Sequence, residues 1–178
     1  MTEQPTERPQ AGPGLYLPDF ILGATDGVIT TLAIMSGVVG ADLPMAIVLI
    51  LGFANLIADG ISMAASNILS RRSSTGPEAL PTYRAAGRHG LATFLGFVLA
   101  GLVPLFAYLV PGIPVDRRYL VAALLALLTL FVVGAGRAFF TRRHWLIAGV
   151  EMLALGALAG AAAYGVGALG AWLVGSVQ

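Results

Sequence analysis

Acidic residues and a methionine lie inside apolar stretches of this sequence. Asp26 follows the start of one stretch, Asp59 and Met63 lie within the next, and Glu151 follows the start of the last. A carboxylate in lipid hydrocarbon costs about 3 kcal/mol or more, so it persists where it faces protein, water, an ion or an opposite charge. We therefore interpret these residues as marking a path for ions through a membrane.

Depth brings three of these side chains to one level. With a rise of about 1.5 Å per residue, Asp26, Met63 and Glu151 each lie ~9–10 Å from the same end of their expected helices. We predict that they act together as metal ligands. Two other interpretations stay open: Met63 fills an apolar core, and Glu151 is the ion-pair partner of Arg137.

Polar residues recur every four positions along the second apolar stretch. Asn55, Asp59, Met63 and Asn67 therefore follow one slowly turning face of a helix. On the first stretch, Thr30 lies one turn beyond the acid and extends the polar track. A cation would meet ligands in steps along this track, whereas we expect Asn67 to form hydrogen bonds between helices.

Composition places the chain in a membrane. Of its 178 residues, 57% are hydrophobic and 11% are charged. The net charge of +1 is spread through the connections, which excludes a nucleic-acid-binding face. Cysteine is absent, which excludes disulfides, thiolate metal sites and cysteine catalysis. All ten basic residues are Arg, and the chain is rich in Ala, Gly and Leu, a bias that favours a bacterial inner membrane.

Five apolar segments predict an all-α integral membrane bundle that spans the lipid bilayer. We expect helices at about 20–40, 45–70, 90–110, 119–140 and 145–174, in one transmembrane domain over residues 18–178. Residues 1–17 are polar and rich in Pro and Gly, as in a disordered tail. A tight turn is expected at 42–44. Residues 71–89 form the one long loop, and we expect His89 and His144 to be solvated in loops.

Arginine is unevenly divided between the two ends of this bundle. With the tail inside, the inner end carries eight arginines and the outer end two. The inner ones are Arg8, Arg71, Arg72, Arg84, Arg88, Arg137, Arg142 and Arg143, and the outer ones are Arg117 and Arg118. Positive residues favour the cytoplasmic side, so we predict the N-terminus inside and the C-terminus outside.

Two short elements resemble those of the vacuolar iron transporter family, which transports divalent iron and manganese. Gly23-Ala24-Thr25-Asp26-Gly27 is similar to the Asn-Asp-Gly element of its first span, with Thr25 in place of Asn. Ser62-Met63-Ala64-Ala65 is similar to the Ser-Met-Ala element of its second span. The stretch that begins Glu151-Met152-Leu153-Ala154 resembles the family's last span.

The resemblance implies five spans, a homodimer with the path at the subunit interface, and export of Fe²⁺ or Mn²⁺ from the cytosol in exchange for protons. It also implies that Asp26 and Met63 line this path. Two features depart from the family. A Gly-Glu pair of the second span is replaced by Ser66-Asn67, and we expect Asp59 to compensate for the missing acid. The cytoplasmic metal-binding domain of eukaryotic members is absent between spans two and three.

Our mechanistic hypothesis assigns a step to each candidate ligand. Asp26 and Met63 bind a dehydrated cation, Asp59 passes it outward, and Glu151 assists binding or carries a proton. The metal is substrate, and no resident cofactor is expected. Two other classes are weighed: a non-transporting scaffold or regulatory subunit, and an intramembrane aspartic protease. The protease requires a shared proton between Asp26 and Asp59, whose expected depths differ by ~7 Å.

Overall fold

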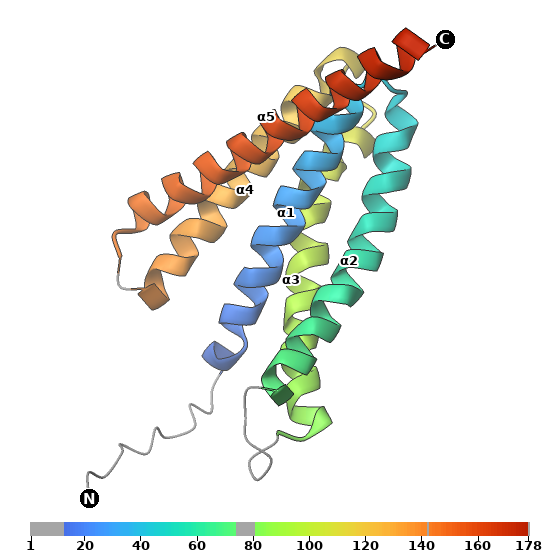
Figure 1. Ribbon diagram of the computed structural model, residues 1–178. Coiled ribbons are helices and arrows are strands. Elements are labelled where there is room, and N and C mark those ends of the chain that lie inside the picture. Colours follow the sequence, from blue (N-terminus) through green and yellow to red (C-terminus); the bar gives the residue numbers. More distant parts are fainter. Residues whose placement is uncertain (1–12, 74–80, 142, 178) are drawn as a thin grey trace, which may run out of the picture.

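The described part of the chain is entirely helical. The computed structural model describes residues 13–73, 81–141 and 143–177, and Figure 1 shows its long helices. In order along the chain, the elements are η1 (Pro13–Leu15), α1 (Leu17–Gly40), α2 (Met45–Ser73), α3 (Tyr83–Leu109), η2 (Val115–Arg117), α4 (Arg118–Thr141) and α5 (Trp145–Val177). Each of α1 to α5 is long and apolar enough to cross a membrane, which confirms the predicted all-α, five-span architecture.

Two helices extend into the expected long loop. Helix α2 continues to Ser73, and α3 begins at Tyr83 rather than near residue 90. The early start has a local cause, because the Thr82 hydroxyl accepts a hydrogen bond from the Ala85 N–H at 3.2 Å and caps the helix. The expectation of a loop was therefore wrong for residues 71–73 and 83–89. Residues 74–80, like most of the expected tail (1–12), lie outside the described residues.

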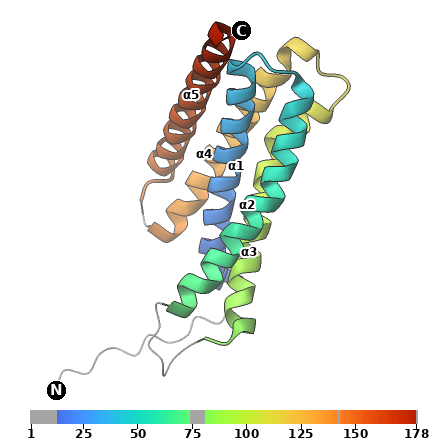
Figure 2. The ribbon, with the colours of Figure 1, turned by 45° about the vertical axis from the view of Figure 1, so that its right-hand side comes forward.

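Helix α1 is the centre of the bundle. It contacts each of the other four long helices. Figures 1 and 2 show it running between α2 and α3 on one side and α4 and α5 on the other. About half of the apolar window of α1 and of α3 is buried, against 22–28% for α2, α4 and α5. Helices α1 and α3 therefore form the core, and the other three present broad outer faces.

Glycines let α1 approach α3 at backbone distance. A Cβ atom on Gly23 or Gly27 would collide with backbone atoms of Thr93 or Phe97, and one on Gly96 would collide with the backbone of Phe20. Larger side chains are excluded at these crossings. Gly23 and Gly27 are therefore packing positions within one chain. This contact holds the segment that carries Asp26 rigidly against α3.

The turn between α1 and α2 lies where it was predicted, around residues 42–44. Asp42 adopts a left-handed conformation with φ of 52°, and the Asp42 and Leu43 N–H groups donate to the Val39 and Val38 carbonyls at 3.1 and 3.0 Å. This pattern is a Schellman motif, which ends a helix sharply. The start of α1 and the end of α5 lie at opposite ends of the bundle (Figure 1), as an odd number of spans requires.

Candidate metal-binding site

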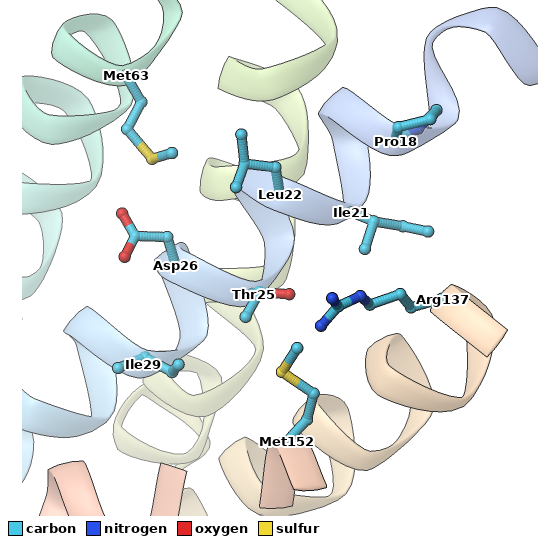
Figure 3. A pocket seen from close by; sticks show the side chains of 9 residues that line it. All are labelled: Pro18, Ile21, Leu22, Thr25, Asp26, Ile29, Met63, Arg137 and Met152. Atoms are coloured by element: carbon cyan, nitrogen blue, oxygen red, sulfur yellow. The ribbon is translucent and has the colours of Figure 1, made fainter. Parts of the chain in front are cut away.

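A cavity of about 610 Å³ lies between α1, α2, α4 and α5. Figure 3 shows the residues that line it: Pro18, Ile21, Leu22, Thr25, Asp26, Ile29, Met63, Arg137 and Met152. The Asp26 carboxylate points toward the Met63 thioether, and Met152 lies on the far side of Thr25. The structure thus brings two of the predicted ligands, Asp26 and Met63, to the same cavity.

The backbone around Asp26 is a regular, well-bonded helix. The Thr30 hydroxyl donates to the Asp26 carbonyl oxygen at 2.8 Å and also lies 3.3 Å from the Gly27 carbonyl oxygen. Its proton is therefore directed at the helix backbone rather than along the predicted polar track. The flanking glycines fix α1 against α3. The Asp26 side chain is thereby presented to the cavity from a rigid element.

Met152 is a cavity residue that the sequence interpretation missed. Met152 as a whole is 8% exposed, and it faces the cavity from the first turns of α5. Gly156 and Gly160, one and two turns further along, are buried against α4 and α1. A signal was present in the sequence, because Met152 continues this four-residue stripe of small residues onto the side of α5 that packs inward.

Glu151 lies away from the Asp26 cavity. Its side chain is 49% exposed and accepts a hydrogen bond from Arg143 at 3.3 Å. Together with Arg137, Arg143 and Ala148 it lines a smaller cavity of about 270 Å³. The predicted depth was correct, in that the first turns of α5 do reach the level of the cavity. Neighbouring residues on a helix, however, point in directions that differ by about 100°. At this level the residue that points into the cavity is Met152 and not Glu151.

Asp59 lies one helical turn beyond Met63 and does not line the cavity. It is half-buried on α2. One turn further, the Asn55 side-chain nitrogen is buried and finds no acceptor in the described part of the chain. Polar groups thus continue outward from the cavity along α2, as the four-residue spacing predicted.

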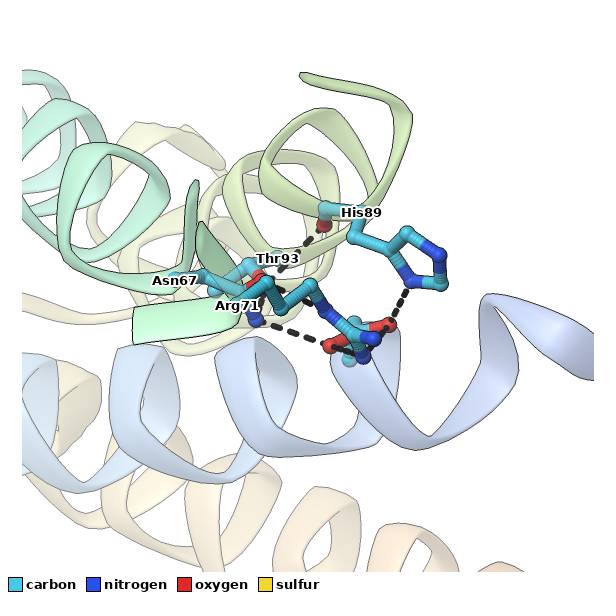
Figure 4. Close-up of polar contacts among 5 residues, drawn as sticks. Asn67, Arg71, His89 and Thr93 are labelled. Atoms are coloured by element: carbon cyan, nitrogen blue, oxygen red, sulfur yellow. Dashed lines mark hydrogen bonds and ion pairs between the residues drawn. The ribbon is translucent and has the colours of Figure 1, made fainter. Parts of the chain in front are cut away.

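A second polar cluster lies at the end of the bundle where α1 and α3 begin and α2 ends (Figure 4). Its centre is Asp19, which is 4% exposed and was not among the predicted site residues. The Asp19 carboxylate accepts hydrogen bonds from Asn67 at 2.8 Å and from Arg71 at 2.8 and 2.9 Å, and it lies 2.6 Å from the His89 ring. The expected interhelical role of Asn67 is confirmed.

His89 is not the solvated loop residue that was expected. Because α3 begins at Tyr83, His89 lies on its second turn, and its side chain is only 13% exposed. The sequence does contain a pattern that points to Asp19, since this acid lies seven residues before Asp26. This spacing is two helical turns, which places both acids on one side of α1.

A cavity of about 330 Å³ adjoins the Asp19 cluster. It is lined by Asp19, Leu22, Ser62, Met63, Ser66, Asn67, Ser70 and Arg71. Leu22 and Met63 line this smaller cavity and also the larger one. The two cavities therefore adjoin at these two side chains, with the buried Asp19 on one side and the half-buried Asp26 on the other.

The larger cavity offers mixed donors. In residues 13–73, 81–141 and 143–177, no three side chains of the His, Cys, Asp and Glu types are grouped as a metal site. The donors on the cavity wall are the Asp26 carboxylate, the Thr25 hydroxyl and the thioethers of Met63 and Met152. Carboxylate oxygens suit Mn²⁺ and Fe²⁺, and thioether sulfur favours the softer transition metals over Mg²⁺ or Ca²⁺.

Comparison with known proteins gives consistent matches. A sequence model of the VIT family matches residues 17–79 and 75–168, two parts that meet at the connection between α2 and α3. The "Vacuolar iron transporter" of Toxoplasma gondii is 25% identical over 90% of this chain and 76% of its own length. "Vacuolar iron transporter 1" of Eucalyptus grandis is 25% identical over 86% of each chain. "Vacuolar iron transporter homolog 4" of Arabidopsis thaliana is 31% identical over 52% of each.

Proposed function

Since the chain belongs to the VIT family, we propose that it carries divalent iron, and also manganese, across a membrane through the cavity at Asp26. The observation that carries this proposal is the facing pair of Asp26 carboxylate and Met63 thioether on the wall of a cavity inside a bundle of membrane-spanning helices. Iron is the first substrate to test, because relatives over most of the chain are named as iron transporters.

The bound cation is held by Asp26 with thioether donation from Met63, and Met152 lines the same cavity on the other side of Thr25. One negative charge and soft donors bind Fe²⁺ or Mn²⁺ weakly enough for release, as transport requires. Asp59 takes the cation onward, and Asn55 lies one turn beyond it on the same face of α2. Glu151 has no place in this path, because it faces the smaller cavity beside Arg143.

The direction of transport follows from the arginines. In the described residues, Arg71, Arg72, Arg84, Arg88, Arg137 and Arg143 belong to the end of the bundle at which α1 begins, and Arg117 and Arg118 to the other end. We place the arginine-rich end in the cytosol. The metal then enters near Asp26 and leaves at the far end, with protons moving in the opposite direction. The all-arginine composition supports a bacterial plasma membrane.

We also propose that two chains form a homodimer through α2. Five small residues on this helix, one per turn, are all exposed in the single chain: Ala54, Ala58, Ser62, Ser66 and Ser70. Small residues at four-residue spacing let two helices approach closely, and hydroxyls are better placed against protein than against lipid. The polar stripe with Asp59 would then face the subunit interface.

Uptake of Fe²⁺ and Mn²⁺ into proteoliposomes under a pH gradient tests the function. We expect the wild-type protein to take up both metals and Asp26→Asn to lose at least about 90% of the flux, because the amide removes the only charge among the described residues that favours a cation on the cavity wall. Asp116→Asn is the matched control, since Asp116 lies in the connection between α3 and α4 and its side chain is 79% exposed.

Each outcome has a distinct meaning. Normal flux in Asp26→Asn would contradict the assignment of Asp26 to the site but not the proposal that the protein transports metal. No flux in correctly inserted wild-type protein would favour the alternative, a non-transporting scaffold or regulatory subunit. Flux that does not respond to the pH gradient would contradict proton exchange alone.

A further inference from the structure

Arg71 occupies a position that is built for a cation. Its guanidinium donates to both oxygens of Asp19, at 2.8 and 2.9 Å, and to the side-chain oxygen of Asn67 at 3.1 Å. Three oxygen atoms from two helices therefore converge on one positive group (Figure 4). A carboxylate and an amide oxygen are also the ligands that hard and borderline divalent cations prefer. The guanidinium stands where such a cation would lie.

This position opens onto the path proposed above. The inner cavity of about 330 Å³ includes Asp19, Asn67 and Arg71 in its wall and reaches Leu22 and Met63, where the Asp26 cavity begins. Asp19 and Asp26 are seven residues apart on α1, a rise of ~10 Å. A cation arriving from the arginine-rich end would meet Asp19 first and Asp26 second.

The two partners differ in their freedom to move. The Asp19 side chain is 6% exposed and is held by Asn67 as well as by Arg71, whereas the Arg71 side chain is 39% exposed and belongs to the last turn of α2. Arginine carries its charge on a long, flexible stem that reaches water from a helix end. If the arginine withdraws, the Asp19 carboxylate stays in place, because it keeps its contacts with Asn67 at 2.8 Å and with the His89 ring at 2.6 Å.

We propose that Arg71 is a tethered cation that blocks a second, inner metal site formed by Asp19 and Asn67, and that an incoming divalent cation displaces it on the way to Asp26. This inference rests on the proposed function and assigns the gate of the same path. Because Arg71 competes for the same oxygen atoms, the inner site of the wild-type protein holds a metal only in passing. Arg71 then prevents metal from remaining there and keeps the inner ends of α1 and α2 together when none is present.

Equilibrium binding of Mn²⁺ to the purified full-length protein tests the proposal. We expect Arg71→Gln to bind one Mn²⁺ per chain more than the wild type, because the charge that competes for Asp19 is gone. The double variant Arg71→Gln/Asp19→Asn should lose this additional equivalent. Arg72→Gln is the matched control, since the neighbouring Arg72 lies over the Tyr83 ring, 3.4 Å from its centroid, and should bind as the wild type does.

A second measurement uses the unmodified protein, in case Arg71→Gln does not fold. Displacement by Mn²⁺ should release the Arg71 guanidinium and increase its modification by phenylglyoxal at least about threefold, as read by peptide mass spectrometry. Arg117, whose side chain is 73% exposed, should react equally with and without Mn²⁺. Unchanged or slower modification of Arg71 with Mn²⁺ bound would overturn the proposal, as would an unaltered stoichiometry in folded Arg71→Gln.

Failure of the gate is separable from failure of the function. If the wild type transports Mn²⁺ but Arg71→Gln gains no equivalent, the Asp19 cluster is a structural lock and the Asp26 path stands. If the wild type transports neither metal, the transport proposal fails, whatever the binding experiment shows for Arg71.

Discussion

Thioether sulfur is the feature of the Asp26 cavity that distinguishes between metals. Met63 and Met152 reach this cavity from α2 and α5, and Asp26 supplies the charge. A carboxylate alone attracts Mg²⁺ and Ca²⁺ as well as Fe²⁺ and Mn²⁺. We infer that the methionines set the preference among cations and Asp26 sets the overall strength of binding.

Replacing a cavity methionine should therefore change selectivity more than rate. In Met63→Leu and Met152→Leu, we expect the ratio of Fe²⁺ to Mn²⁺ uptake to fall about threefold to tenfold, a change of up to ~1.4 kcal/mol. Leu nearly conserves the volume of Met, so the fold should be kept. Met35→Leu is the control, because Met35 is fully buried in the core. Competition uptake with both metals measures the ratio, and equal ratios in all variants would contradict this role.

Removal of the Glu151 charge should have little effect on transport. Its partner Arg143 is exposed, and exposed ion pairs contribute about 0–1 kcal/mol. We expect Glu151→Gln to keep metal flux within about twofold of the wild type in the proteoliposome assay. A loss comparable to that of Asp26→Asn would show that Glu151 reaches the path in another conformation of the protein.

Residue type and spacing were enough to predict the facing pair of Asp26 and Met63, but not the direction of every side chain. Glu151 and Met152 share one depth, and only the packing of α5 decides which of them faces inward. Asp19 was missed because it lies where the first helix was expected to begin. Its burial depends on Asn67, Arg71 and His89, which come from two other helices, and no pattern within one segment predicts such a meeting.

At the scale of helices, apolar length was sufficient to predict all five spans. The beginning of α3 was not predicted, because the sequence from Tyr83 to His89 is polar and basic. Its helical state depends on the Thr82 cap and on the bond between His89 and Asp19. Tertiary contacts of this kind override the local preference of a polar segment. The inner cluster therefore exists only because α2 and α3 extend beyond the apolar segments.

Backbone packing between α1 and α3 predicts a steep dependence on side-chain size. In Gly96→Ala, the new Cβ would collide with the backbone of Phe20, which cannot move aside as a flexible side chain could. We expect a loss of about 1–3 kcal/mol in the free energy of unfolding. Gly136→Ala is the matched control on α4, because no atom lies within 4 Å of its added Cβ. It should be neutral or stabilising, by up to ~1 kcal/mol.

Thermal unfolding of the two variants in detergent, followed by circular dichroism, measures this difference. The contrast between the two glycines is the informative quantity, because both substitutions add the same methyl group to a helix. Equal stability of Gly96→Ala and Gly136→Ala would show that α1 and α3 do not approach as closely as the structure indicates.

At the scale of the whole molecule, the outer faces of α2 and α4 differ in chemistry. The exposed stripe of α4 consists of Leu120, Leu124, Leu128 and Val132, each about 58–59% exposed, and it suits lipid. On α2, large apolar residues such as Ile57, Ile61 and Leu69 are also exposed, but beside them runs a stripe of small residues that includes three serines, next to the half-buried Asp59. One subunit leaves this face uncovered, so a second copy is the partner that would shield it from lipid.

The absence of cysteine from the chain allows a direct test of this arrangement. Single substitutions Ala58→Cys and Ser62→Cys place a thiol on the small-residue stripe of α2, and Leu124→Cys and Leu128→Cys place one on the equally exposed stripe of α4. With a short bifunctional thiol reagent in native membranes, we expect covalent dimers from the α2 variants and monomers from the α4 variants. Two copies of the same position can be joined only where a twofold axis passes nearby, so dimers from α2 alone would place that axis beside Asp59 and the outward path. Dimers from α4 alone would move the subunit interface to the opposite side of the bundle and leave the polar stripe of α2 to be covered by water or lipid headgroups.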